Sequence, residues 1–107
     1  MFVHARFDRH GQFTDPTLLI LASLAGGAKH GYAMMTDIAE FSGVSMEPGT
    51  LYGALARLER EGWVEALEAE TRRRPYRLTA TGEQVLRQQI AAIGRVVAVG
   101  RRRLAVA

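Results

Sequence analysis

Two short stretches hold most of the side chains whose types and spacing suit binding chemistry. Residues 45–61 combine glycines, hydroxyl side chains and two arginines, and residues 72–74 are three consecutive arginines. Guanidinium groups suit a surface that contacts the phosphates of a nucleic acid. Small residues beside them let the protein backbone approach a groove closely. The competing interpretation is two ordinary solvated faces, since arginine is mostly exposed in any protein.

The first stretch is predicted to form a helix over about residues 48–61, because both of its ends are marked. Pro48 suits the first turn, where its missing N–H leaves no bond unmade, and Gly62 suits the left-handed position just beyond the end. An apolar stripe at i, i+4 and i+7 predicts the buried face: Leu51, Leu55 and Leu58. Glycines inside a helix cost about 1 kcal/mol each relative to alanine. We therefore expect the opposite face, with Gly49 and Gly53, to be open for a close approach.

Catalytic and metal chemistry are not indicated. The sequence has no cysteine, no glycine-rich phosphate loop and no nucleophile elbow, and its serines have no histidine at a suggestive position. His4, Asp8 and His10 match no tight ligand spacing, and isolated histidines are usually polar surface. We expect no enzyme activity, no cofactor and no metal site.

The composition favours a small cytoplasmic domain with a polyanionic partner. The 107 residues fit one domain, 48% are hydrophobic, the net charge is +3 and the pI is about 10.0. Charges interrupt the first ten residues, so they do not resemble a signal peptide. The longest apolar run, residues 18–22, is far too short to span a bilayer, so no membrane association is expected.

The elements before residue 48 are predicted as an arm and two helices. Residues 1–14 show no periodicity and are assigned as an N-terminal arm. Asp15 and Pro16 mark the start of a nearly all-apolar helix that Gly26 ends. A second helix runs from about His30 to Gly43. With the helix at 48–61, a short glycine-containing turn then completes a helix-turn-helix arrangement.

After Gly62 the period of the sequence changes to that of strands. Residues 63–68 and 76–79 are strand-like, and the second of these alternates apolar and polar side chains. Pro75 at a strand start suggests an edge strand. The predicted hairpin, about residues 63–79, carries the three arginines at its tip. A hairpin that follows a helix-turn-helix is a wing, so residues 15–79 are assigned as a winged helix-turn-helix domain.

The last part, residues 80–107, is predicted to be a long helix with a basic tail. Apolar residues follow a 4-3-4 spacing that is typical of a coiled-coil seam: Leu86, Ile90, Ile93 and Val97. Such a helix is too long to fold back on so small a domain, so we expect it to pair with a second copy. The predicted fold is therefore mainly helical with a small β-hairpin, a winged helix-turn-helix with a long C-terminal dimerisation helix.

Several motifs together resemble the PadR family of transcriptional regulators. The matching pieces are residues 30–32 (His-Gly-Tyr), 48–52 (Pro-Gly-Thr-Leu-Tyr), 55–62, 73–79 (Arg-Arg-Pro-Tyr-Arg-Leu-Thr) and Gly82. The combination of Gly-Thr-Leu-Tyr with a later Tyr-Arg-Leu-Thr is specific, although either piece alone is weak. The resemblance covers about residues 15–104 and corresponds to the members with a short C-terminal region.

The resemblance implies a homodimer that represses a nearby promoter. Two helix-turn-helix units related by a two-fold axis are expected to read a pseudo-palindromic operator in double-stranded DNA. The resemblance also implies that Thr50 and Tyr52 meet DNA, that Tyr32 supports or touches the backbone, and that the wing arginines contact phosphates. The DNA-binding surface predicted from pattern and resemblance together comprises Tyr32, Ser45, Gly49, Thr50, Tyr52, Gly53, Arg57, Arg72, Arg73 and Arg74. Glu47 departs from the family, which often has a small polar residue there. A carboxylate at this place is expected to cap the helix but to repel phosphate.

Two questions stay open at the level of sequence. The alternative function is a winged-helix module that binds protein and not DNA, because acidic side chains flank the basic surface: Glu59, Glu61, Glu65, Glu68 and Glu70. The sequence is also compatible with an unknown small-molecule effector, to which it assigns no residue.

Overall fold

The computed structural model describes residue 7 and residues 11–105 of the chain. Over these residues the elements follow in the order α1 (Pro16–Ala25), β1 (Lys29–His30), α2 (Gly31–Ser42), α3 (Pro48–Arg60), β2 (Val64–Ala66), β3 (Pro75–Leu78) and α4 (Ala80–Ala105). This order confirms the predicted class, mainly helical with a small antiparallel sheet and a long C-terminal helix. The described residues do not include the three side chains considered above as metal ligands: His4, Asp8 and His10.

The first two helices begin and end where the sequence marks them. Asp15 caps α1, and its side chain accepts a hydrogen bond from the Thr17 amide at 3.1 Å. His30 caps α2, and its Nδ1 accepts a hydrogen bond from the Ala33 amide at 3.3 Å. Gly43 ends α2 in the left-handed conformation, with a φ of 77°. Local sequence therefore fixes the first two helices of the domain.

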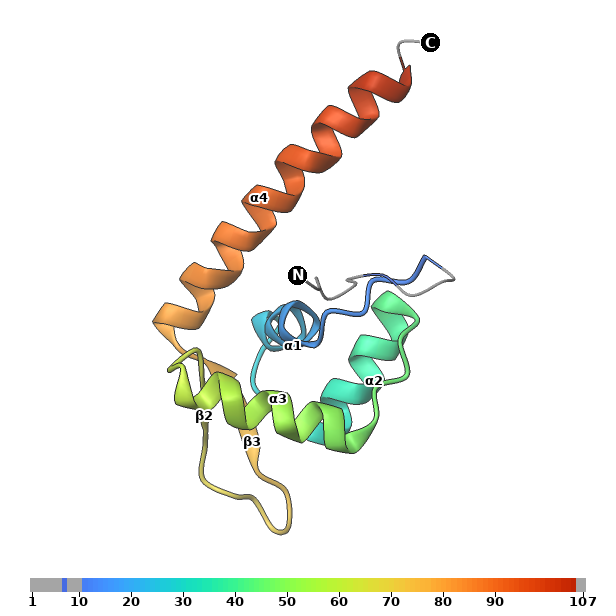
Figure 1. Ribbon diagram of the computed structural model, residues 1–107. Coiled ribbons are helices and arrows are strands. Elements are labelled where there is room, and N and C mark those ends of the chain that lie inside the picture. Colours follow the sequence, from blue (N-terminus) through green and yellow to red (C-terminus); the bar gives the residue numbers. More distant parts are fainter. Residues whose placement is uncertain (1–6, 8–10, 106–107) are drawn as a thin grey trace, which may run out of the picture.

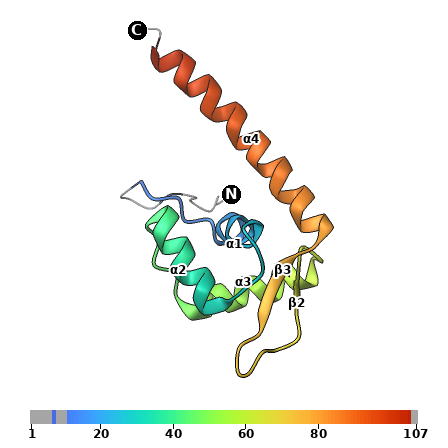
Figure 2. The same ribbon diagram turned by 180° about the vertical axis from the view of Figure 1, so that it is seen from behind.

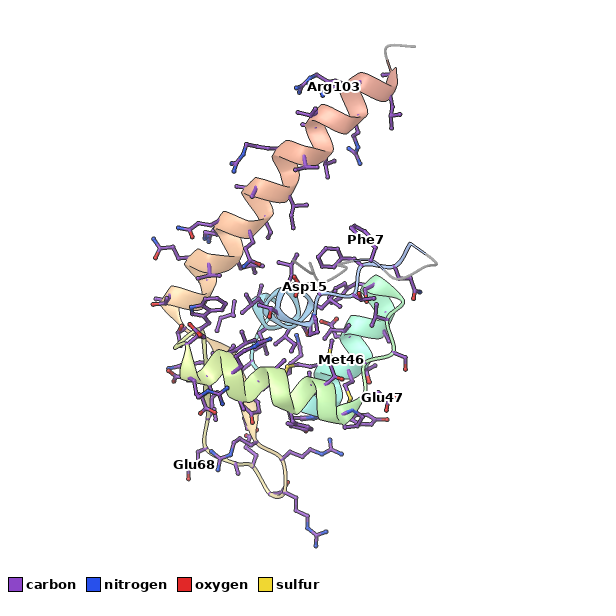
Figure 3. The ribbon with its side chains drawn as sticks, in the orientation of Figure 1. Phe7, Asp15, Met46, Glu47, Glu68 and Arg103 are labelled. Carbon is purple, nitrogen blue, oxygen red and sulfur yellow. The ribbon has the colours of Figure 1, made fainter. Side chains whose placement is uncertain are left out.

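The helix α3 also has its predicted ends, but not its predicted cap. Pro48 occupies the first turn, and Gly62 follows the last turn with a φ of 78°. Glu47 holds the N-cap position without any side-chain capping hydrogen bond, and it lies at the outer end of α3 (Figure 3). The expected capping contact of Glu47 is therefore wrong. Glutamate is longer than the serine, threonine, aspartate or asparagine side chains that suit this position.

One hydrophobic core joins α1, α2, α3, β2 and the start of α4. Its members are Leu19, Ile20, Leu21, Leu24, Met34, Ile38, Met46, Leu51, Ala54, Leu55, Leu58, Val64 and Leu86. The helix α1 is apolar nearly all round because it contacts α2, α3, α4 and β3. Each fully buried aliphatic side chain contributes about 1.5–3 kcal/mol from transfer alone, so this core holds α3 firmly in place.

A small polar network joins α1 to α2 beside this core. Ser23 is buried, and its hydroxyl donates to the Asp37 carboxylate at 2.7 Å. Lys29 lies 3.7 Å from the same carboxylate and also donates to the Ser23 carbonyl. The buried hydroxyl therefore has a partner, as buried polar groups generally require.

The wing is part of a three-stranded antiparallel sheet, in the order β1-β3-β2. The predicted hairpin is β2 with β3, in which Glu65 lies opposite Arg77. The strand β1 was not predicted from the sequence. Its two residues pair with the start of β3, so that His30 lies opposite Pro75. The expectation that Pro75 marks an edge strand is therefore wrong. Pro75 begins the central strand, a position that proline tolerates because it is the first residue of that strand.

The junction between β3 and α4 is a single residue, Thr79. Its hydroxyl donates to the Gly62 carbonyl at 2.6 Å and accepts from the Gly82 amide at 3.0 Å. Gly82 lies against the backbone of Trp63, and a Cβ at this glycine would overlap the Trp63 carbonyl group. The start of α4 is therefore pressed onto the end of α3 and the start of the wing.

The helix α4 extends far beyond the body formed by the other elements (Figures 1 and 2). The chain measures 57 × 30 × 28 Å, and its radius of gyration of 15.3 Å exceeds the value of about 13 Å typical of a compact domain of this length. No helix in the described part of the chain is both long and apolar enough to cross a membrane.

The apolar residues of α4 divide into two groups. Leu86 is 5% exposed and belongs to the core of its own chain, so the prediction that it contacts a second copy is corrected. Ile90 is 55% exposed, Val97 is 42% exposed and Ile93 is half-buried. The first two turns of α4 therefore complete the domain, and the rest of the helix presents apolar side chains outside it.

Candidate nucleic-acid interface

An open groove of about 490 Å³ lies between the N-terminus of α2, one flank of α3 and the wing. Its lining residues are His30, Tyr32, Tyr52, Arg72, Arg73, Arg74 and Tyr76. Five of these seven were predicted from the sequence to bind DNA. The two that sequence reasoning missed are His30 and Tyr76. Tyr76 lies on a predicted strand, but only the pairing of β1 with β3 brings His30 beside the wing, and a two-residue strand has no periodic signal.

Two tyrosines project from neighbouring helices at this groove. Tyr32 is 67% exposed on the first turn of α2, and Tyr52 is 48% exposed on α3. The Tyr52 ring lies against the backbone of Gly31, where a Cβ would come within 2.7 Å of the ring carbon Cζ. The glycine of the His-Gly-Tyr motif therefore makes room for the tyrosine of the Gly-Thr-Leu-Tyr motif.

The outward face of α3 is open, as its glycines predicted. A Cβ at Gly49 or Gly53 would have nothing within 4 Å, and Ser45 and Thr50 are exposed. At 3.6 residues per turn, Arg60 lies on the same face as the two glycines, and it is exposed too. A flat surface of small residues with a cation at one end can approach a nucleic-acid groove closely.

Arg57 lies apart from the other predicted contacts. Its position on the helix places it on the flank of α3 opposite Tyr52, and its guanidinium donates to the Thr17 hydroxyl of α1 at 3.0 Å. It lines a separate hollow that also includes Trp63 and Gln89. The structure therefore does not bring Arg57 together with the groove, although its side chain is exposed.

The tip of the wing is a tight turn over residues 70–73. The backbones of Glu70 and Arg73 exchange two hydrogen bonds of 2.7 and 3.0 Å. Thr71 has a φ of 54°, a left-handed conformation that is unusual for a β-branched residue. Arg74 donates to the Leu67 carbonyl across the wing at 3.2 Å. Among the described residues, Arg72 makes no hydrogen bond or ion pair, so its guanidinium is available to a partner.

The surroundings of Tyr76 alter its ionisation. Partial burial raises the pKa of the Tyr76 phenol above 10.0, and the nearby Glu59 carboxylate and Tyr52 raise it further, while Arg74 opposes them. The phenol therefore keeps its proton at neutral pH and remains a hydrogen-bond donor inside the groove.

The acidic residues around this surface are partly neutralised. Glu65 accepts hydrogen bonds from Arg77 on the neighbouring strand at 2.7 and 3.0 Å. No aspartate or glutamate lines the groove among the described residues.

Within residue 7 and residues 11–105, no three histidine or acidic side chains gather as a potential metal site.

Most of the chain matches the model of a known protein family. The profile of the transcriptional regulator PadR-like family matches residues 20–88, which run from α1 into α4. The matched region contains the whole groove, the open face of α3 and the wing.

Two known protein sequences are similar to this chain over most of its length. An uncharacterised 37.1 kDa protein of transposon TN4556 from Streptomyces fradiae is 43% identical over 82 residues, which cover 77% of this chain and 24% of that protein. The transcriptional activator GvpE2 of Halobacterium salinarum is 34% identical over 67 residues, 63% of this chain and 34% of that protein. The chain thus spans about a quarter and a third of the lengths of these relatives.

Solved structures share the fold. A PadR family transcription regulator from Clostridium difficile superposes with a TM-score of 0.75 at 23% identity, over 83% of this chain and 97% of that one. A transcriptional regulator from Clostridium thermocellum superposes with a TM-score of 0.71 at 28% identity, over 81% of this chain and 87% of that one. With the family match over most of the domain, the chain belongs to the PadR-like family of transcriptional regulators, which are not enzymes.

Proposed function

We propose that this chain is a dimeric repressor that binds a pseudo-palindromic operator in double-stranded DNA. In this proposal α3 enters the major groove with its small-residue face, and the wing arginines lie along the adjacent phosphates. The protein acts in the cytoplasm, where it blocks a promoter by occupying it.

The observation that carries the proposal is the arrangement of cations and small residues around α3. The open face with Gly49 and Gly53 has no neighbouring atoms to prevent a close approach. On one flank of that face lies the groove with three arginines, three tyrosines and no acidic side chain among the described residues. Phosphate contacts position a protein on DNA, and a flat helix face reads base edges.

The dimer is supported by the exposed apolar side of α4. Ile90, Ile93 and Val97 follow one stripe of this helix, and two of them are more than two-fifths exposed in the single chain. A contiguous apolar patch of this kind is rare on a monomer. Two copies joined through α4 would present two α3 helices to half-sites about 34–36 Å apart.

The second candidate function is a winged-helix module that binds protein. Glu59, Glu61, Glu68 and Glu70 are exposed near the basic surface and support this alternative. None of them lines the groove, so the basic surface itself remains uniform in charge, which favours the DNA-binding function.

The two functions are distinguished by selecting bound sequences from a random pool of DNA duplexes. A DNA-binding regulator enriches a pseudo-palindrome, and its affinity falls steeply with salt. A protein-binding module enriches no sequence. A reporter gene with the enriched site over its promoter then tests repression: expression should fall when the protein is present, and a rise would instead show an activator.

A further inference from the structure

His30 contacts a hydrogen-bond donor at each of its two ring nitrogens. Its Nδ1 lies 3.3 Å from the backbone nitrogen of Ala33, in the capping position of α2. Its Nε2 lies 3.2 Å from the Nη1 nitrogen of Arg73 on the wing. A backbone amide and a guanidinium both donate and never accept.

A neutral imidazole has one accepting nitrogen and one N–H, so it cannot accept from both donors. The Ala33 amide is held in the first turn of α2 and aims at Nδ1, whereas the Arg73 side chain is exposed and can turn away. The tautomer that keeps the bond to the helix amide has its acceptor at Nδ1 and its proton on Nε2. The Nε2–H group and the Arg73 guanidinium then face each other as two donors without an acceptor between them.

No carboxylate among the residues that line the groove supplies that acceptor. Both residues line the groove beneath the wing, where no acidic side chain lies among the described residues. His30 is also fixed in place through β1, because it lies opposite Pro75 in the sheet. A single anionic oxygen that lies to one side of this pair can be at an ordinary distance of about 2.9 Å from both nitrogens, which are 3.2 Å apart.

We propose that His30 and Arg73 together hold one phosphate of the DNA backbone, with His30 donating its Nε2–H and Arg73 its charge. This inference rests on the proposed function and deepens it, because it adds a neutral donor to the phosphate contacts. His30 thus has two roles: its Nδ1 caps α2, and its Nε2 positions the DNA strand between α2 and the wing.

The two roles can be separated by substitution. Asparagine is among the best N-cap residues, so His30→Asn keeps an acceptor for the Ala33 amide but is too short to reach the phosphate. Serine also suits the N-cap position, so His30→Ser is a second variant that keeps the cap but cannot reach the phosphate. Both should melt at the wild-type temperature and should bind the selected operator about tenfold more weakly for each half-site, the loss expected for a hydrogen bond to a charged group.

Neutral phosphates identify the contact directly. In a series of operator duplexes, each phosphate in turn is replaced by a methylphosphonate. At one position in each half-site, the methylphosphonate should weaken operator binding by the wild type strongly. The same replacement should weaken binding by His30→Asn or by Arg73→Ala little further. Arg73→Ala should reduce the log–log salt slope by about 0.9 for each protomer, whereas His30→Asn should leave the slope unchanged because it removes no charge.

Two results would overturn the inference while leaving DNA binding intact. In the first, both capping variants bind the operator like the wild type. In the second, the methylphosphonate penalties in His30→Asn are the same as in the wild type at every position. Failure of the wild-type protein to enrich or bind any duplex would instead overturn the proposed function itself, and the phosphate contact with it.

Discussion

The phenol ring of Tyr52 lies directly on the backbone of Gly31, so that a Cβ on this glycine would fall 2.7 Å from the ring carbon Cζ and still closer to the hydroxyl oxygen. Gly31 and Tyr52, which have twenty residues between them in the sequence, thus form one packed unit at the edge of the groove.

This contact predicts that Gly31→Ala destabilises the protein and displaces Tyr52. An overpacked buried site typically costs about 1–3 kcal/mol. Removing the ring in Gly31→Ala/Tyr52→Ala should recover part of that loss, which denaturant unfolding of the two single variants and the double variant would measure. Losses that simply add would contradict the packing contact, since residues in contact are expected to be coupled.

The open face of α3 predicts opposite effects of Gly53 variants on stability and binding. Gly53→Ala and Gly53→Leu should both stabilise the protein by several tenths of a kcal/mol or more, because each replaces glycine in a helix and meets no neighbouring atom. Only the leucine should abolish specific DNA binding, since its bulk prevents the close approach. Operator binding by Gly53→Leu at wild-type affinity would mean that this face does not meet DNA.

The wing arginines should act through charge and not through sequence. Replacing Arg72, Arg73 and Arg74 with alanine should weaken binding to all duplexes alike and reduce the log–log salt slope by about 0.9 for each lost phosphate contact. Arg95→Ala, an exposed arginine of α4 outside the groove, serves as the control and should leave the slope unchanged. Equal slopes for the triple variant and the control would exclude the wing as a phosphate-binding element.

The dimer should depend on the middle of α4. Ile90→Asp/Ile93→Asp should give monomers, aggregates or misfolded chains, and specific DNA binding should vanish in each case. Burial of these side chains against a second copy is worth roughly 1.5–3 kcal/mol each. Ala98→Asp adds a charge on a different side of the same helix and is the control. Sedimentation of the wild type at low micromolar concentration checks the state directly, and a well-folded monomer there would contradict the dimer.

Stability should fall at alkaline pH because of Tyr76. Burial and Glu59 raise the pKa of this phenol in the folded state above 10.0, so the folded protein holds the proton more tightly than the unfolded chain. The stabilisation is fully present below about pH 10 and is lost as the pH rises through the folded pKa. Urea unfolding at pH 8 and above pH 10 should show this loss in the wild type and a smaller one in Tyr76→Phe.

The helices and their ends could be predicted because their signals are local. The cap at Asp15, the left-handed glycines Gly43 and Gly62, and the leucine stripe of α3 each depend on a few neighbouring residues. The open face of α3 followed from its glycines in the same way. Features of this kind can be predicted because neighbouring residues in the sequence determine them.

The features that were missed depend on contacts between distant segments. The strand β1 has two residues and forms only because the start of β3 lies beside it, so neither the central position of Pro75 nor the place of His30 in the groove was visible. Arg57 was predicted from its helix face, but the contact with Thr17 requires knowing where α1 lies. Leu86 fits the spacing of a dimer seam, yet the first turns of α4 are used to close the core of its own chain.

The single-residue junction at Thr79 has a consequence for how the length of this chain can vary. Each residue inserted into or removed from a helix start turns everything after it by about 100°. One extra residue between β3 and α4 would therefore rotate the apolar stripe of α4 by more than a quarter turn relative to α3 and the wing. Thr79 therefore sets the rotation of the surface proposed to join two copies relative to the surface proposed to read DNA. An insertion or deletion at this point is expected to disrupt that relation.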